Sequence, residues 1–340
     1  ALDASKAKVS TDLLYDGDVT KWKRFGFSLL LRASMRLSKV NPAKSAEYVA
    51  KAVAGGLMQS NADNAIIRHN ASFANPIGSQ LNGGQSAFFY LAEDFVEFLK
   101  KANDPRLEAI SVRYVGATSG AQQIESRANR TKDAQIGAPL GYDNTTITVA
   151  VKEKKLASLW DYSQLDRTRV GGLNAPSFLV TYSQTQLLLA EAVHRKWTTG
   201  TIATLFSNGI KAHMQQFASY GTTSTISEAA INAYLLANPL TPGKELEEIN
   251  TPDQILNIDL AQGQNWFLWP SGYQVLNNLT YNNSGDPDNT NTVFQFNGQS
   301  LHSQYYWGLE TNLGYINVLN PKNGTILTDI NDAEKQYVIL

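Results

Sequence analysis

Residues 176–221 read PSFLVTYSQTQLLLAEAVHRKWTTGTIATLFSNGIKAHMQQFASYG and carry the most regular hydrophobic pattern in the chain. Apolar residues recur every three or four positions over residues 178–197 and again over residues 202–220, which is the period of an α-helix. The polar turn at residues 198–200, Thr-Thr-Gly, separates the two stretches. The segment therefore predicts two antiparallel helices that form a helical hairpin.

A second, similar hairpin is predicted near the start of the chain. Apolar residues recur at helical spacing over residues 20–40 and 42–57, and Asn41-Pro42 breaks the chain between them. The positions expected to face the core are Trp22, Phe25, Leu29, Ala33 and Leu37 in the first helix and Ala46, Val49, Ala50, Val53 and Leu57 in the second. Two hairpins of this size favour a mainly α-helical fold, in which tetratricopeptide-like helix pairs form a scaffold.

The segment between the two hairpins predicts long irregular loops and a few short strands. Residues 61–85 are rich in Asn, Ala, Gly, Ser and Pro, which is typical of loops, and a helix is expected over residues 88–99. Alternating apolar residues predict short strands at residues 110–114 and 147–151, on either side of a stretch rich in Gly, Ala, Gln and Asn. Loops of that length are usually functional or disordered.

After the second hairpin the chain changes character. Capping residues predict a short helix at 227–238 and another at 251–269, and the residues beyond Pro270 favour irregular structure. We expect a single domain over residues 1–340. Its parts are a helical hairpin at 1–60, a loop-rich region with a helix and short strands at 61–175, a second hairpin with a short helix at 176–240, and a helix with an irregular C-terminal region at 241–340.

The composition excludes several classes of partner and site. The 29 Lys and Arg residues nearly balance the 30 Asp and Glu residues, so the net charge is −1 and no basic surface for nucleic acid or anionic lipid is expected. The absence of cysteine excludes disulfides, thiolate nucleophiles and zinc–thiolate sites. The 28 Asn and 19 Gln residues, beside six Trp and 15 Tyr, suit neutral polar ligands, because rings offer flat apolar faces and amides offer paired donors and acceptors.

No motif for catalysis or metal binding stands out. The four histidines form no HExxH or metal-spaced pair, although His194 and His213 fall in the two helices of one hairpin, and no Gly-x-Ser-x-Gly or phosphate-binding glycine motif occurs. Asp286, Asp288 and Asn289 resemble part of a calcium loop but lack the glycine and the closing glutamate of an EF-hand. We therefore expect no catalytic residue, no metal site and no cofactor.

Two segments, taken together, resemble a known family. Residues 15–32 resemble the Y-x-G-D-x-x-K-W-x-K-F-x-x-S-L-x-x-R signature of the SusD/RagB-like nutrient-binding lipoproteins of bacterial outer membranes. Residues 174–197 resemble that family's second block, with Ala-Pro, Thr-Tyr, Ala-Glu-Ala and the closing Trp in order. Between them, Asp104-Pro105-Arg106-Leu107 and Gly141-Tyr142-Asp143 fall in the expected sequence.

The chain also departs from this family pattern in places. Gln184 stands where the second block has a glutamate. Residues 264–273 keep the two tryptophans and the Gly-Tyr of a later family motif but lack its paired arginines. Complete members are longer at the N-terminus, so the resemblance implies that this chain lacks the part that carries the lipid anchor.

The resemblance implies a non-catalytic cell-surface protein of the outer membrane that captures an oligosaccharide. The implied partner is a TonB-dependent SusC-like transporter, and membrane attachment would come only from the lipid anchor of the N-terminal part. The family's ligand surface maps onto the loops at residues 71–85 and 116–174. Candidate ligand-binding residues in these loops are Tyr142, Trp160, Asp161, Tyr162 and Arg167.

Three alternatives remain open at the level of sequence. A peptide ligand, as for RagB-like members, would use charged groups such as Asp161, Arg167 and Arg169. A glycoside hydrolase would need two carboxylates whose separation of roughly 5–10 Å only the fold can supply. A purely structural helical scaffold would bind no small molecule at all.

Overall fold

The computed structural model describes residues 11–83, 90–139, 146–246 and 248–249, together with the backbone of three strands beyond residue 278. The described chain is mostly helical, as predicted, and it divides into two compact units. Unit 1 consists of Ala1–Gln85, Lys101–Ile110 and Asp166–Gln262, and unit 2 consists of Ser86–Lys100, Ser111–Leu165 and Gly263–Leu340. The assignment of the whole chain to a single domain stays a prediction.

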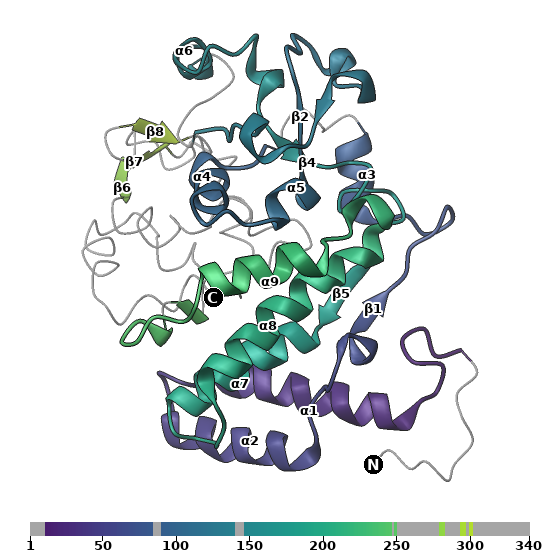
Figure 1. The fold of residues 1–340 in the computed structure, drawn as a ribbon, viewed down its shortest axis with the longest axis vertical. Helices are drawn as coiled ribbons and strands as arrows, with labels where there is room; N and C mark the ends of the chain where they lie inside the picture. Colours follow the sequence, from purple (N-terminus) through teal and green to yellow (C-terminus); the bar gives the residue numbers. More distant parts are fainter. Residues whose placement is uncertain are drawn as a thin grey trace. The chain divides into compact units, whose positions relative to one another are not determined.

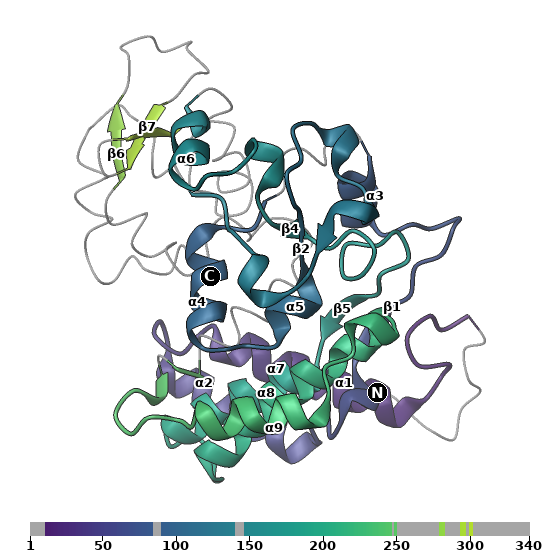
Figure 2. The same ribbon diagram turned by 45° about the horizontal axis from the view of Figure 1, so that its top comes forward.

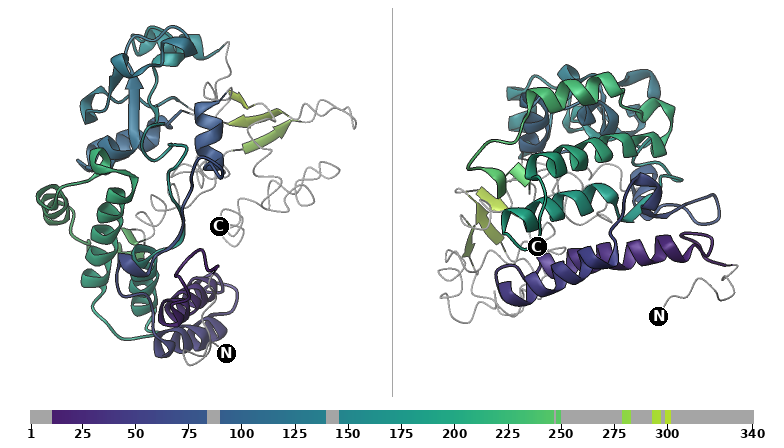
Figure 3. Two further views of the ribbon diagram at one scale, coloured as in Figure 1. Left: turned by 90° about the vertical axis from the view of Figure 1, so that its right-hand side faces the viewer. Right: turned by 60° about the horizontal axis from the view of Figure 1, so that its bottom comes forward.

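Unit 1 contains both predicted hairpins (Figure 1). The first is α1 (Val19–Met35) with α2 (Pro42–Gly55), and the second is α7 (Tyr182–His194) with α8 (Ile202–Gln216). Helix α1 contacts α7, and α8 contacts α9 (Glu228–Ala237), so the helices stack in successive layers (Figure 3). The unit is completed by the short helices α3 (Pro76–Asn82) and α5 (Arg106–Ile110), the 3-10 turns η1 (Asn61–Asp63), η7 (Phe217–Tyr220) and η8 (Thr222–Ser224), and the antiparallel pair β1 (Ala65–Ile67) and β5 (Ser177–Val180).

The start of α1 shows why the first sequence signature has its spacing. Asp16 and Gly17 both adopt positive φ, which makes the tight turn before the helix. Asp18 then caps the helix, because its carboxylate accepts hydrogen bonds from two first-turn backbone N–H groups, those of Thr20 (2.9 Å) and Lys21 (3.1 Å). The hydroxyl of Tyr15 donates to the carbonyl of Asp63 (2.8 Å), which ties the turn to η1.

The buried face of the first hairpin differs in part from the predicted one, although Val49 is buried as predicted. The residues of α1 that are buried are Ser28, Leu31, Ser34 and Met35, whereas Leu29 is 41% exposed and Trp22 and Phe25 are only half-buried. In α2 the buried residues are Ser45, Val49 and Ala52, while Ala50 and Val53 are exposed. The reason is that small hydroxyl residues occupy the contact: Ser45 Oγ donates to the carbonyl of Ser34 (2.7 Å), and Ser28 Oγ accepts from the backbone of Met58 (3.0 Å). A pattern of apolar residues does not reveal a buried helix face that is formed by serines.

The second hairpin begins later than the hydrophobic period suggests. The predicted helix over residues 178–197 is wrong in its first turn, because Ser177–Val180 forms β5 and pairs with β1. Thr181 then caps α7, with its hydroxyl accepting from the backbone N–H of Gln184 (3.1 Å). A short apolar run before a capping threonine is compatible with either a helix or a strand. Here the pairing with β1 makes the run a strand.

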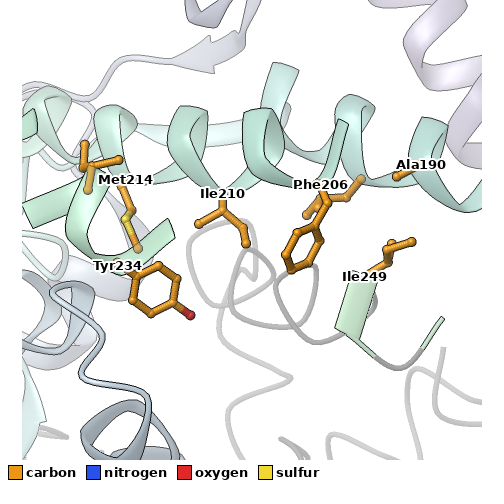
Figure 4. Close-up of a cluster of buried hydrophobic side chains, with 8 residues drawn as sticks. Ala190, Phe206, Ile210, Met214, Tyr234 and Ile249 are labelled. Atoms are coloured by element: carbon orange, nitrogen blue, oxygen red, sulfur yellow. The ribbon is translucent and has the colours of Figure 1, made fainter. Parts of the chain in front are cut away.

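The core of unit 1 lies on the side of α8 that faces α7 and α9. Its buried members include Leu187, Phe206, Ile210, Met214 and Tyr234, as Figure 4 shows for most of them. These residues confirm the predicted helical spacing in α8. The helices approach closely at Gly209, where a Cβ atom would lie 2.7 Å from Cγ of Leu187. A glycine is therefore required by the packing of α7 on α8.

A buried ion pair joins three elements of unit 1. Asp104 and Arg106 both have fully buried side chains and form a charge-assisted pair in which Arg106 Nε lies 2.9 Å from Asp104 Oδ1. Asp104 also accepts from the backbone N–H of Arg106 (2.9 Å) and so starts α5. Arg106 Nη1 donates to Nδ1 of His213 on α8 (3.0 Å), and its guanidinium lies 5.7 Å from the ring centre of Tyr234 on α9.

The pKa shifts in this cluster follow from its burial. Burial alone would lower the pKa of Arg106, but the carboxylate of Asp104 raises it above its usual value, so the guanidinium stays charged. Burial raises the pKa of Tyr234 to about 12, against the opposing effect of the neighbouring Arg106. His213 accepts from an arginine, which has no acceptor atom, so its Nδ1 carries no proton. His213 is thus a buried structural residue on α8.

Unit 2 is built around a short antiparallel sheet. Strand β2 (Ser111–Tyr114) is central and pairs with β3 (Ala128–Asn129) on one side and β4 (Gln164–Leu165) on the other (Figure 2). The predicted strand near residue 112 is thereby confirmed. The other elements are the helices α4 (Glu93–Lys101) and α6 (Ile147–Glu153), the 3-10 turns η3 (Gly120–Gln122), η4 (Glu125–Arg127), η5 (Lys132–Ala134) and η6 (Leu159–Asp161), and a meander of β6 (Leu279–Asn282), β7 (Val293–Phe296) and β8 (Gln299–Leu301).

The strand predicted at residues 147–151 is wrong, because this segment is the helix α6. Ile147, Ala150 and Val151 are buried together at the i, i+3, i+4 spacing of a helix, in one cluster with Tyr162, while Val149 is 55% exposed. The β-branched residues favour a strand intrinsically, but packing against the cluster overrides this preference. The predicted helix at 251–269 and the calcium-like residues Asp286, Asp288 and Asn289 lie outside the described residues.

The close approach of α7 and α8 predicts the effect of adding one methyl group. Gly209→Ala should lower the free energy of unfolding by about 1–3 kcal/mol, because the new Cβ would overlap the side chain of Leu187. Gly26→Ala on α1 is the control, since nothing lies within 4 Å of the place its new methyl group would take and alanine favours a helix. Urea unfolding should show loss for the first variant and no loss for the second. Equal stability of both variants would contradict the close packing.

The buried ion pair predicts a large loss when one partner is removed. Arg106→Met should destabilise the protein by roughly 3–5 kcal/mol, because Asp104 would remain as an uncompensated buried charge. The double variant Asp104→Leu/Arg106→Met should regain part of that loss, since no charge is left buried. Chemical unfolding of the two variants checks this, and a double variant less stable than the single one would argue against the pair.

Candidate functional site

A pocket of about 330 Å³ lies within unit 1, between the loop that precedes β5, the end of α3 and the turn η7. Its lining combines one aromatic ring, two side-chain amides, two guanidinium groups and two hydroxyls with a backbone floor. The lining residues are Asn82, Arg167, Thr168, Arg169, Gly172, Leu173, Asn174, Ala175, Pro176, Ser219 and Tyr220.

The loop that carries most of these residues, 166–176, is fixed by hydrogen bonds to α3. Asn82 Nδ2 donates to the carbonyl of Gly171 (3.0 Å), and Asn75 donates from its backbone to Leu173 (2.7 Å) and from its side chain to Ala175 (2.9 Å). At Gly78, which belongs to α3, a Cβ atom would lie 2.4 Å from the carbonyl oxygen of Gly172. The helix and the loop therefore meet backbone to backbone, and this contact leaves no room for a side chain at Gly78.

The same loop is also tied to α5. The backbone N–H of Asp166 donates to the carbonyl of Ile110 (2.8 Å), and Arg169 Nη1 donates to the carbonyl of Glu108 (2.9 Å). Asp166 is buried and its carboxylate accepts from Thr168, through both the backbone N–H (2.9 Å) and the hydroxyl (2.8 Å). Its other oxygen lies 3.4 Å from Arg169 Nε. The conformation of the arginine-bearing loop is thus set by α5 and one buried carboxylate.

The chemistry of the lining suits a hydroxyl-rich ligand. Tyr220 is half-buried and held against Phe178 and Phe217, with ring centres 5.9 and 5.8 Å apart. Asn82 and Asn174 are exposed amides of the lining. The Nδ2 group of Asn82 already donates to the carbonyls of Gly78 (2.9 Å) and Gly171 (3.0 Å), so Asn82 offers its Oδ1 as an acceptor, whereas the amide of Asn174 can both donate and accept. A ring for stacking beside amides and guanidinium groups is a combination that can hold a sugar.

Of the five predicted ligand residues, Arg167 lines this pocket. Tyr142 lies outside the described residues. Trp160, Asp161 and Tyr162 lie in unit 2, at and after η6, and do not belong to the pocket of unit 1. The predicted ligand-side loops at 71–85 and 116–174 do supply Asn82 and the residues from Arg167 to Asn174 to the pocket.

Asp161 is placed in the interior of unit 2 and is used there. Its Oδ1 accepts from Arg113 Nε (3.1 Å) and from the backbone of Gly116 (2.9 Å), and its Oδ2 accepts from the backbone of Ala157 (3.1 Å). Only 2% of Asp161 is exposed. Both carboxylate oxygens therefore hold together three segments of unit 2.

The two aromatic neighbours of Asp161 also pack within unit 2. Tyr162 is buried in the cluster that contains α6 and meets Tyr90 edge-on. Trp160 is half-buried over the cluster of β2, and its ring lies against Gly120, where a Cβ atom would be 2.9 Å away. Ligand contact by Tyr142, Trp160, Asp161 and Tyr162 stays a prediction.

Sequence reasoning missed Asn82, Asn174, Ser219 and Tyr220 as pocket residues. Asn174 precedes the Ala-Pro of the second signature, and Tyr220 precedes the Gly221 that ends the helical pattern. The sequence signal that could have indicated these residues is their position directly beside the end of a helix or strand, because rigid elements position such residues well.

The described residues show few other candidate sites. Among them, no three His, Cys, Asp or Glu side chains are grouped in a way that could hold a metal ion. None of the helices in the described part of the chain has the length and hydrophobicity of a membrane span.

A comparison with protein families shows which family the chain belongs to. Residues 1–293 match the model of the SusD-like family that is described as starch-binding and associating with the outer membrane. The chain belongs to the SusD-like family. No curated protein matches its sequence.

Solved structures agree with the SusD-like assignment. A chitin-binding protein is 27% identical with a TM-score of 0.64, over 76% of this chain and 53% of that one. A chitin-binding SusD homologue from Flavobacterium johnsoniae is 25% identical with a TM-score of 0.51, over 68% of this chain and 42% of that one. A SusD homologue from Bacteroides fragilis covers 99% of this chain and 71% of that one, with a TM-score of 0.66, and at 20% identity it supports the fold.

The SusD-like chain is shorter than several of these relatives. It spans about half the length of the chitin-binding protein, 53%, and 60% of a SusD-like protein described as Bacteroidetes AC2a. The mainly helical, tetratricopeptide-like fold predicted from the two hairpins is confirmed by these matches.

The placement of Asp161 predicts a loss of stability on substitution. Asp161→Ala should lower the free energy of unfolding by roughly 3 kcal/mol, because Arg113 and two backbone N–H groups would lose their buried acceptor. Asp133→Ala is the matched control, since Asp133 is an exposed carboxylate of the same unit. Thermal unfolding of both variants checks the expectation. A fully stable Asp161→Ala protein would show that the carboxylate is not needed for folding.

Proposed function

We propose that this SusD-like protein is a non-catalytic surface protein that binds an oligosaccharide in the pocket of unit 1. The observation that carries the proposal is the lining itself, where Tyr220 lies beside two amides and two guanidinium groups. The family description as starch-binding and the chitin-binding neighbours support a carbohydrate as the ligand class. Stacking on the ring and hydrogen bonds from the rim would hold the sugar without breaking a bond.

Delivery of the ligand to a SusC-like TonB-dependent transporter belongs to the same proposal. It is supported by family membership and by the family's description as associating with the outer membrane. The layered helices of unit 1 would supply a rigid docking face, and a lipid anchor on the N-terminal part of a longer protein would keep it at the cell surface.

Glycoside hydrolysis is the less favoured alternative for this pocket. That reaction needs an acid and a base or nucleophile, both carboxyl groups, on opposite sides of the scissile bond. Among the described lining residues there is no Asp or Glu, and the nearby Asp166 is buried and bonded to Thr168. The lining therefore supports binding rather than cleavage. A peptide ligand in the manner of RagB remains the second binding alternative.

The proposal predicts that a rim amide contributes to glycan affinity. Asn174→Ala should weaken binding of the best oligosaccharide in a panel of neutral and acidic glycans by about tenfold, which is one to two lost hydrogen bonds. Asn174 is exposed, so the change should leave stability unaltered. Isothermal titration calorimetry of the wild type and the variant measures the difference.

The matched control is Asn232→Ala, an exposed asparagine on α9 that does not line the pocket. Trp160→Ala measured alongside tests the sequence-based expectation for unit 2. Equal affinity of wild type and Asn174→Ala, together with a loss in Trp160→Ala, would move the ligand away from the pocket. Release of shorter sugars during incubation would instead favour a hydrolase.

A further inference from the structure

We propose that the pocket of unit 1 selects an acidic oligosaccharide, one that bears carboxylate groups, over a neutral one. The inference rests on the proposed function, because it takes the glycan as given and concerns only its charge. It also revises the expectation of a neutral ligand that composition suggested.

Arginines line the pocket, and the carboxylate that pairs with one of them is buried. Arg167 and Arg169 are both lining residues, and the described lining holds no Asp or Glu. Asp166 is fully buried beneath the loop, and Glu108 on α5 approaches Arg169 through its backbone carbonyl. A ligand in the pocket would therefore meet the guanidinium groups first. This arrangement contrasts with the chain as a whole, whose net charge is −1.

The guanidinium of Arg169 is held in place before any ligand arrives. It donates to the carbonyl of Glu108 (2.9 Å) and lies 3.4 Å from Asp166 Oδ2, and its side chain is only 15% exposed. Holding an arginine in a fixed position reduces the side-chain entropy that binding would otherwise cost. A planar guanidinium matches the geometry of a carboxylate, with which it forms paired, charge-assisted hydrogen bonds. A neutral hydroxyl makes weaker bonds with the same group.

The remaining lining favours a sugar acid over an acidic peptide. Tyr220 offers a ring for a pyranose face, and the hydroxyl of Ser219 and the rim amides of Asn82 and Asn174 can pair with ring hydroxyls. A peptide would require a row of backbone donors and acceptors. In this loop the backbone carbonyls of Leu173 and Ala175 instead accept hydrogen bonds from Asn75.

The test compares two forms of one ligand that differ only in charge. The affinity of an oligogalacturonate is measured by calorimetry beside the same oligosaccharide with its carboxylates methyl-esterified, at low and at physiological salt. We expect the acid to bind about tenfold more tightly than the ester, with the difference shrinking as salt increases. A chitooligosaccharide and a glutamate-rich peptide complete the set of probes.

Variants locate the charge preference in the pocket. Arg167→Gln should lower the affinity for the acid by a larger factor than the affinity for the ester, so that the preference for the acid shrinks while Arg169 keeps part of it. Arg68→Gln is the control, because Arg68 is an arginine of the same unit outside the pocket. The comparison of acid and ester on the wild-type protein needs no variant, so it decides the question even where a variant folds poorly.

The outcomes separate this proposal from the one on which it rests. A preference for the acid that Arg167→Gln reduces and Arg68→Gln leaves intact supports it, whereas a preference that neither variant changes places its origin outside the pocket and overturns it. Equal binding of acid and ester, or a neutral chitooligosaccharide that binds at least as tightly as the acid, overturns the charge preference and leaves glycan binding standing. Binding of the peptide alone, or of none of the glycans, overturns both.

Discussion

The buried ion pair of Asp104 and Arg106 is the constraint from which the arrangement of unit 1 follows. Two charges with no exposure can remain inside a protein only when each satisfies the other, and here Arg106 also reaches α8 and α9 through His213 and Tyr234. The pair thereby fixes the short helix α5. The carbonyls of α5, from Glu108 and Ile110, in turn hold the loop that lines the pocket. A helix of five residues could not hold that loop by its own stability.

Most residues that mark the family are structural in this protein. Tyr15 and Asp18 build the entrance to α1, and Thr181 caps α7. Asp104 and Arg106, which stand in the family's expected order, form the buried pair. These residues specify the scaffold, whereas the ligand is left to the side chains that the scaffold presents.

The hydrophobic pattern of the sequence predicted the long helices better than the short elements. The long periodic segments were assigned correctly as α1, α2, α7 and α8, because many residues in each of them indicate the same period. The short segments were not: Ile147–Glu153 is a helix and Ser177–Val180 a strand, since tertiary partners decide such cases. The buried serines of the first hairpin were missed because their contribution is close approach and hydrogen bonding.

The candidate site was predictable only in outline. Family resemblance indicated the loops that supply Asn82 and residues 167–174 to the pocket, and of the five predicted ligand residues Arg167 lines it, while ligand contact by Arg167 stays a prediction. Asp161 looked like a ligand carboxylate beside two rings, but its environment of Arg113 and two backbone N–H groups depends on contacts distant in sequence. The sequence alone does not distinguish a loop carboxylate that binds a ligand from one that stabilises the fold.

The contact between Gly78 and Gly172 divides the pocket loop into two sides with different tolerance to sequence change. On the inner side, backbone touches backbone, and any larger residue at Gly78 would push the loop away from α3. On the outer side, Leu173 and Asn174 are exposed and make no demand on the packing beneath them. The rim side chains can therefore be replaced without loss of stability in the scaffold. One helical framework can in this way carry different sets of rim side chains, with the change confined to a few surface positions.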